Sequence, residues 1–441
     1  MKNFFRKMGY ETVPDEFYYQ IDKWLGWYKG KVASFHSYNQ YNGKKLIARE
    51  RATLSSAKKV CEDWANLILN EKMEINIPNE DIKKYIEKVL FDNNFKVCAN
   101  RLTELAFALG TGAFVEYIDN GKIVIDYIGA NMIYPLSWEN GRIYECAFAS
   151  EKVVDKRRVT YVNMHILEDG KYKIVNKMFD KKTGDEIELP KGIMPFYYTN
   201  SSTAFFQIIT PNIVNNVDFE NPMGISVFAN SIDVLKGIDL IFDSYQNEFR
   251  LGKKRIIVPV TMAQMMSDKS GLTPVFDDND TEFYAIKAND GINDIKEINM
   301  TLRSDEHETA LKRCLNLLSL KCGLGSSRYD IDKSGLKTAT EVISEKSELY
   351  ENLKKHQLVM EKAICDLVYA ICTLSGIKCD FEVSVYFDDS IIEDTGAIAK
   401  RMLTEYKSGV IDDVEYFMKV YNLTEEAAIE KSEKINARIL K

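Results

Sequence analysis

A long run of helical periodicity between Thr338 and Gly376 limits what this chain can fold into more than any other feature. The run opens with a predicted capping box, in which the Thr338 hydroxyl accepts from the Glu341 amide. Apolar residues then follow at steps of three, four or seven: Val342, Leu349, Leu353, Met360, Ile364, Leu367 and Ile371. A helix of this length is roughly 55 Å long. One ordinary domain does not bury such a helix along its whole length, so we expect an extended molecule or assembly.

Composition places the chain among globular proteins. Its 441 residues, 45% of them hydrophobic, are enough for a large core and for about two to four structural units. The net charge of -8 argues against tight binding of nucleic acid, although an acidic surface can still border DNA that must slide. The eight cysteines are scattered without a CxxC pair, which favours buried thiols in a reducing cytosol. No signal peptide and no apolar run long enough for a membrane span occurs, so we expect a cytoplasmic origin and no membrane partner.

The first half of the sequence changes from helical to strand periodicity. Helices are predicted over residues 10–31, 53–70, 82–91 and 97–109, with a short strand over 73–77. After Gly110-Thr-Gly-Ala113, the run Asp119-Asn120-Gly121 predicts a β-hairpin. Further strands are expected over 143–150, 158–167 and 172–179. Helices followed by an antiparallel sheet predict an α+β fold.

The second half is mainly helical around one β-rich insert. A helix capped by Ser226 is expected to end near Gly252, where the basic triplet Lys253, Lys254 and Arg255 suits its C-terminal end. Residues 256–300 contain short strands, and seven acids stand against two lysines within 276–300. A helix over 304–322, a polar insert over 323–337, a strand over 381–387 and helices over 396–406, 412–421 and 425–440 complete the chain; Thr424 is the expected cap of the last helix.

Catalytic motifs are missing from the sequence. It contains no P-loop, no HExxH and no GxSxG, and the four histidines have no paired metal spacing. Asp388-Asp389 offers carboxylates for Mg²⁺, although a turn at the end of a strand is the simpler interpretation. We therefore expect no enzyme, no cofactor and no metal. A Mg²⁺-dependent nuclease, inactivated by Asp388→Ala, stays open as the alternative.

Four motifs and their order resemble the portal proteins of tailed double-stranded DNA bacteriophages, in the branch common among phages of Gram-positive bacteria. The motifs are Gly110-Thr-Gly-Ala113 before a hairpin, Pro222-Met-Gly-Ile-Ser226 before a helix, Ser334 to Tyr350 at the start of the long helix, and Val385-Tyr-Phe-Asp-Asp-Ser390. The resemblance covers about residues 100–400, and the order of the elements extends it to the whole chain. A different adaptor or minor capsid protein of the virion, without a channel, is a second alternative.

The resemblance implies a ring, usually of about twelve subunits, at one capsid vertex. It implies the virion as location, assembly in the bacterial host cytoplasm, and these partners: other copies of the chain, double-stranded DNA in the channel, the terminase large subunit, a head-completion or adaptor protein, and major capsid and scaffold proteins. It also implies a domain order: wing (1–224), stem helix (225–252), clip (253–302), stem helix (303–322), tunnel loop (323–337), long wing helix with closing strand (338–394) and crown (395–441).

The same resemblance implies candidate site residues. Facing the channel and its DNA would be Arg328, Lys333, Ser334 and Lys337 of the tunnel loop and Lys253, Lys254 and Arg255 at the junction of stem and clip. The clip acids Asp277, Asp278, Asp280 and Glu282 would bind partners. A conduit must touch a polyanion without holding it, because each added phosphate contact raises affinity. A few cations on flexible loops of an acidic chain meet that need.

Overall fold

The computed structural model of the chain describes residues 2–41, 43–70, 72–154, 156–190, 192–252, 255–259, 265–268, 271–274, 283–286, 295–326, 328–330, 339–387, 395–421, 428–429, 431–432 and 434. The helices are α1 (Lys2–Lys7), α2 (Asp15–Tyr28), α3 (Ala33–His36), α4 (Ser56–Ile68), α5 (Glu80–Asp92), α6 (Phe95–Leu109), α7 (Ile232–Leu251), α8 (Ser304–Lys321), α9 (Ala339–Leu374), α10 (Thr395–Lys407) and α11 (Asp413–Tyr421), with 3₁₀ turns η1 (Ala130–Met132) and η2 (Ala229–Ser231).

The strands are β1 (Ser37–Tyr41), β2 (Leu46–Glu50), β3 (Glu74–Asn76), β4 (Gly112–Asp119), β5 (Lys122–Gly129), β6 (Ile133–Glu139), β7 (Arg142–Val154), β8 (Arg157–Glu168), β9 (Lys171–Asp180), β10 (Glu186–Ile187), β11 (Phe196–Tyr198), β12 (Phe206–Ile209), β13 (Arg255–Pro259), β14 (Met265–Asp268), β15 (Gly271–Pro274), β16 (Phe283–Ile286), β17 (Lys296–Ile298) and β18 (Ser384–Tyr386). The largest sheet has the order β10-β9-β8-β7-β6, with β11 also on β9; a second has the order β12-β4-β5. The α+β prediction is confirmed.

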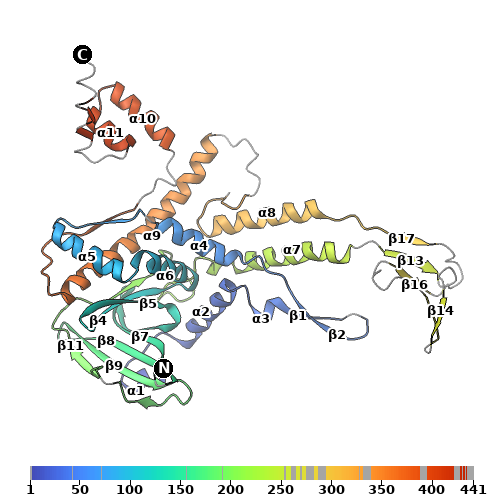
Figure 1. Cartoon of the computed structure of the whole chain (residues 1–441), viewed down its shortest axis with the longest axis horizontal. Coiled ribbons are helices and arrows are strands. Elements are labelled where there is room, and N and C mark those ends of the chain that lie inside the picture. Colours follow the sequence, from blue (N-terminus) through green and yellow to red (C-terminus); the bar gives the residue numbers. More distant parts are fainter. Residues whose placement is uncertain are drawn as a thin grey trace.

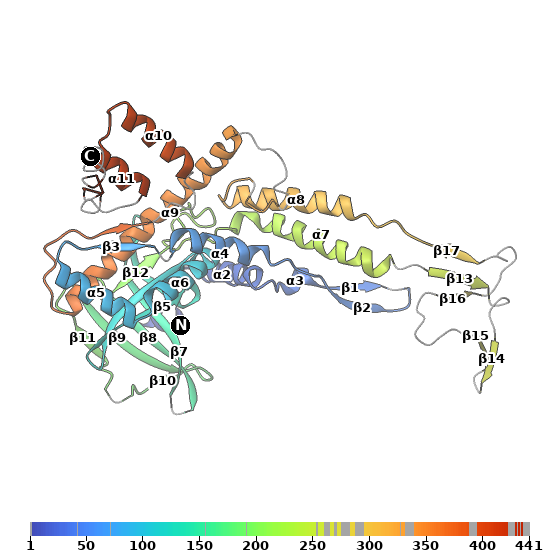
Figure 2. The same cartoon turned by 45° about the horizontal axis from the view of Figure 1, so that its top comes forward.

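The molecule consists of a body from which one long arm projects (Figures 1 and 2). The body contains the six-stranded sheet, the β12-β4-β5 sheet, α2, α4, α5 and α6, and α9 runs across it. The arm is made of α7 and α8, side by side, and carries the strands β13 to β17 at its far end. The hairpin of β1 and β2 extends from the body along the arm, and α10 and α11 stand on the opposite side of the molecule from that hairpin.

The predicted β4–β5 hairpin is confirmed. Asp119 pairs with Lys122, and the two residues between them, Asn120 and Gly121, have φ values of 48° and 75°. Positive φ at both central positions is the geometry that asparagine followed by glycine tolerates best. This turn brings β4 and β5 together, and β4 also pairs with β12 in the same sheet.

The long helix α9 is confirmed over Ala339–Leu374, while its predicted cap Thr338 lies outside the described residues. Its apolar stripe is buried at Leu349, Leu353, Met360, Ile364, Leu367 and Ile371. Trp64 of α4 packs edge-on against His356 of α9, and its indole N–H donates to the carbonyl oxygen of Cys322 at 3.0 Å. One fully buried side chain therefore joins α4, α9 and the end of α8.

Two glycine motifs far apart in the sequence meet in the body. A Cβ atom added to Gly110 would lie 2.2 Å from the carbonyl oxygen of Gly224, and one added to Gly224 would lie 2.3 Å from that of Gly110. The amide of Gly224 donates to the Thr111 hydroxyl at 3.1 Å, and the amide of Val227 donates to the Phe107 carbonyl at 2.9 Å. Only glycine permits this approach, which holds the segment before α7 against the end of α6.

The predicted cap of α7 is wrong. The helix begins at Ile232, preceded by η2, and its N-cap position is Ser231. Ser226 lies earlier and is fully buried: its hydroxyl donates to the Phe107 carbonyl and accepts from the Phe228 amide, both at 3.3 Å. The serine therefore stabilises the turn between body and arm, because local side-chain bonds to the backbone compete with helix formation.

Short strands lie within the described parts of residues 255–300, as the sequence predicts for this insert, and one short strand follows α9. β13 pairs in parallel with β16 and antiparallel with β17, and β18 pairs with β3. Val383, Val385 and Phe387 are buried on one face of the segment predicted as a strand over 381–387, of which Ser384–Tyr386 forms β18. Thr424 and most of the predicted helix over 425–440 lie outside the described residues.

Candidate functional site

The arm, hereafter the stem, is the part of the fold most unlike an ordinary globular domain. Its body-side half belongs to the core through Leu235 and Ile238 of α7 and Leu315 and Leu318 of α8. Gly237 of α7 faces the Cys314 sulfur, where an added Cβ would lie 3.9 Å away. The two helices therefore pack closely and fix the direction of the stem relative to the body.

The clip-side half of the stem is held by polar contacts between its helices. Arg303, just before α8, forms an ion pair with Glu248 of α7, and His307 Nε2 lies 3.0 Å from the Ser244 hydroxyl. Hydrogen bonding from Arg303 lowers the pKa of Glu248. Because the pair is exposed to solvent, its contribution to stability is small. It orients the point where the chain leaves the stem for the clip.

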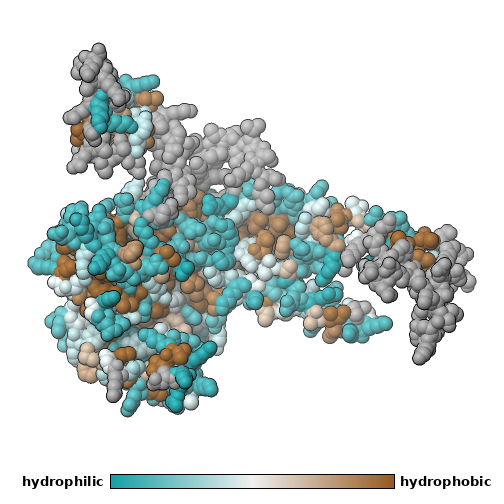
Figure 3. Space-filling model, viewed as in Figure 1, coloured by the Kyte–Doolittle hydropathy of each residue, from teal (hydrophilic) through white to brown (hydrophobic). Residues whose placement is uncertain are grey.

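In the single chain, several large apolar side chains of the stem are exposed to solvent. Figure 3 shows apolar residues along the stem and on the projecting β1–β2 hairpin. Those that are substantially exposed on the stem are Leu240, Phe249, Leu317 and Leu320. Leu317 and Leu320 are three residues apart and share one face of α8, and exposed apolar side chains that gather in this way mark a binding surface.

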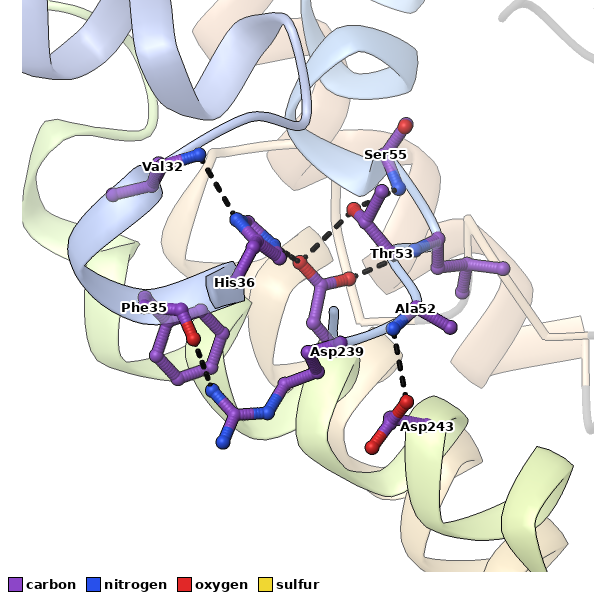
Figure 4. Close-up of polar contacts among 10 residues, drawn as sticks. Val32, Phe35, His36, Ala52, Thr53, Ser55, Asp239 and Asp243 are labelled. Carbon is purple, nitrogen blue, oxygen red and sulfur yellow. Dashed lines mark hydrogen bonds and ion pairs between the residues drawn. The ribbon is translucent and has the colours of Figure 1, made fainter. Parts of the chain in front are cut away.

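The base of the β1–β2 hairpin is bonded to α7 through a buried aspartate (Figure 4). Asp239 accepts from His36 Nε2 at 3.0 Å, from the Thr53 hydroxyl at 3.0 Å and from the Leu54 amide at 2.8 Å. The Val32 amide donates to His36 Nδ1 at 2.9 Å, so the neutral imidazole carries its proton on Nε2. The tautomer that Val32 selects is the one that can donate to Asp239.

A second set of contacts also holds the base of the β1–β2 hairpin. Asp243, one turn further along α7, accepts from the Ala52 amide at 2.9 Å. The guanidinium of Arg51 donates to the Phe35 carbonyl and lies 4.2 Å from the centre of the Phe35 ring. Its carbon also lies 5.0 Å from the centre of the Tyr38 ring. Both ends of the hairpin are therefore tied to the stem, a feature that the sequence interpretation missed although Asn42-Gly43 is a hairpin signal.

The segment predicted as the tunnel loop starts at the body end of the stem. Gly323 and Gly325 have positive φ, and Asn352 of α9 donates to the Gly323 carbonyl at 3.2 Å. Arg328 reaches Asp63 of α4, with 3.3 Å between the guanidinium and the carboxylate, and Lys59 contacts the same oxygen at 2.9 Å. The first residues of the segment are thus bound to the body. Lys333, Ser334 and Lys337 lie outside the described residues.

The other candidate residues are only partly described. Arg255 is the first residue of β13, close after the end of α7, is exposed, and pairs in register with Ile298. Lys253 and Lys254 lie outside the described residues, as do the clip acids Asp277, Asp278, Asp280 and Glu282. Their roles toward DNA and partner proteins stay predictions.

The histidines are packed rather than grouped. His165 and His356 are buried, and burial lowers the pKa of each to about 3. The ring of His356 accepts from the Asn212 amide at 3.0 Å. Within the described ranges, no group of three or more His, Cys, Asp or Glu side chains is placed to hold a metal ion. Asp388 and Asp389 lie outside those ranges.

None of the described helices is both long enough and apolar enough to cross a membrane. No individually curated protein matches the chain. The sequence model of the family described as "Phage portal protein, SPP1 Gp6-like" matches residues 10–441. This match spans nearly the whole chain, and the chain therefore belongs to the SPP1 Gp6-like family of phage portal proteins.

Proposed function

We propose that copies of this chain close into a ring, of about a dozen subunits, at one vertex of the capsid. The observation that carries the proposal is the stem: two packed helices project from the body with Leu240, Phe249, Leu317 and Leu320 in water. In a closed ring, the stem of each neighbouring subunit covers these side chains, and the stems together surround a channel. Membership of the portal family supports a role in the capsid.

The stem can be tested by placing a charge on it. Leu240→Glu and Leu317→Glu are expected to reduce ring formation strongly, because each would bury an unpaired carboxylate in the subunit contact. Val153→Glu, at an exposed position on β7 in the body, is the matched control. Sedimentation velocity measures the ring fraction. Rings that form as well in both stem variants as in the control would refute the proposal.

Residues 323–337 are proposed to line the channel and touch DNA in passage. This part rests on the chemistry of the segment: it carries Arg328, Lys333 and Lys337 among glycines and serines, in a chain whose net charge is -8. In packaging into empty heads, Lys333→Ala with Lys337→Ala is expected to lower the amount of DNA packaged. If rings of this variant package DNA at full efficiency, residues 323–337 do not have the proposed role toward DNA, while the ring proposal is unaffected.

The clip, residues 253–302, is proposed as the docking platform for the terminase large subunit and for a head-completion protein. The short strands β13, β16 and β17 support this, because the edges of a small projecting sheet can pair with strands of another protein. Neutralising Asp277, Asp278, Asp280 and Glu282 together tests the role of charge. The expected result is weaker terminase binding to intact rings; unchanged binding would contradict it.

A further inference from the structure

We infer that the β1–β2 hairpin is an intersubunit arm that docks on the outer face of α8 in the next copy of the chain. The inference rests on the proposed ring and names a contact that closes it. The receiving surface, hereafter the α8 groove, is lined by Asp305, Glu306, Thr309, Ala310, Arg313 and Cys314. The occupant that we assign to the α8 groove is the hairpin of a second copy of this chain.

The hairpin leaves its own apolar residues uncovered. Tyr41 and Leu46 are cross-strand partners near its tip, and they are 64% and 66% exposed. A two-stranded hairpin on its own is only marginally stable in water, because it has no further layer to bury a face against. The contacts at its base fix where the hairpin points but leave this tip pair without cover.

The α8 groove continues into an exposed apolar stripe. Glu306, Thr309, Arg313, Leu317 and Leu320 are all exposed and follow one another at steps of three and four residues. Such residues share one face of the helix. The opposite side of α8 packs against α7 and the body, so this outer face is the one left for a neighbour.

The hairpin and the α8 groove lie on opposite flanks of the stem. Both cartoon views show α7 between α8 on one side and β1–β2 on the other (Figures 1 and 2). In the same views the hairpin runs beside the clip-side half of the stem, which is the half that contains the α8 groove. A rotation about a channel axis along the stem keeps each residue at its own height. It therefore brings one subunit's hairpin level with the α8 groove of the next, as a head-to-tail ring contact requires.

Charge favours the same pairing. The hairpin and its turn, residues 37–50, contain Lys44, Lys45 and Arg49 against Glu50. The α8 groove carries two acids, Asp305 and Glu306 in the first turn of α8, against one cation, Arg313. A basic hairpin tip and an acidic helix start attract each other and set the direction of docking.

Disulfide trapping tests the contact in the whole protein, with a second cysteine placed at Thr309, an exposed position of the α8 groove. The variant Leu46→Cys with Thr309→Cys is assembled into rings, oxidised with copper phenanthroline, and run on non-reducing gels. We expect a ladder of covalent multimers beyond the dimer, about tenfold stronger than in Leu46→Cys alone, since disulfides form only between closely placed residues.

Two further variants make the result decisive. Leu167→Cys on β8 with Thr309→Cys is the control for random collision, and Lys45→Cys with Thr309→Cys repeats the test if the Leu46→Cys variant fails to assemble. Products that stop at dimers would indicate a two-fold contact and overturn the inference. Rings without a ladder in either hairpin variant would overturn it while leaving the ring proposal intact. If the unaltered chain forms no rings at all, both proposals fail together.

Discussion

Replacing Asp239 by asparagine removes one negative charge from the base of the hairpin without changing its shape. If the new amide keeps its oxygen toward the Leu54 amide, its NH₂ group faces the Nε2–H of His36 and the Thr53 hydroxyl. The imidazole cannot change tautomer freely, because Nδ1 accepts from the Val32 amide. If the amide flips, its NH₂ faces the backbone N–H of Leu54 instead. Either orientation places two donors against each other.

The size of the effect follows from these contacts. Three donors lie at 2.8 to 3.0 Å from the carboxylate, and Asp239 is 4% exposed. Hydrogen bonds to charged groups contribute about 1.5–3 kcal/mol each, and a buried donor left unpaired costs about 1–3 kcal/mol. Losing one such bond and leaving one donor unpaired should lower the local opening free energy of the hairpin base by about 2.5–6 kcal/mol.

Hydrogen–deuterium exchange of the peptide covering residues 51–55 measures this directly. A loss of about 2.5 kcal/mol, the lower limit, corresponds to about 70-fold faster exchange of its protected amides. Asp233→Asn is the matched control, since Asp233 lies on the same helix with its side chain 94% exposed and pairs only weakly with Lys236. Exchange in Asp239→Asn within about threefold of the control would refute the assigned role of this carboxylate.

Two other predictions concern the body. Burial raises the pKa of Glu116 from 4.5 to about 8, so the folded state holds a proton that the unfolded chain releases, and stability falls as pH rises through that window. In urea unfolding, the free energy of unfolding of Glu116→Gln should therefore rise relative to that of the unaltered protein by about 1.4 kcal/mol per pH unit from about pH 5 to 8. A difference between the two proteins that does not depend on pH would contradict this. Gly224→Ala should destabilise by about 3 kcal/mol or more, because its Cβ meets the Gly110 carbonyl at 2.3 Å, whereas Gly237→Ala inside α7 should be neutral or stabilising by up to about 1 kcal/mol. Equal melting temperatures for the two alanine variants would argue against the close glycine contact.

Local patterns were sufficient for much of the fold. The stripe from Leu349 to Ile371 predicts α9 because a buried helix face needs apolar residues at helical spacing. Asn120-Gly121 predicts the β4–β5 turn because its geometry needs positive φ at both positions. Both depend only on neighbours in sequence, and both are confirmed.

The remaining features depend on contacts between distant segments. Ser226 has the composition of a helix cap, but its hydroxyl is used by the turn against Phe107, 119 residues away. The pair of Arg328 and Asp63 joins residues 265 apart, so the charge of Arg328 alone did not reveal its bond to the body. The β1–β2 hairpin was missed because its exposed strands lack the apolar alternation of a half-buried strand.

Native mass spectrometry of the purified chain, with negative-stain images of the same sample, is the most direct test of the ring. The prediction is a closed particle of about a dozen 50.6 kDa subunits around a central hole. A stable two-fold dimer that does not convert to rings, even with capsid and scaffold proteins present, would contradict it.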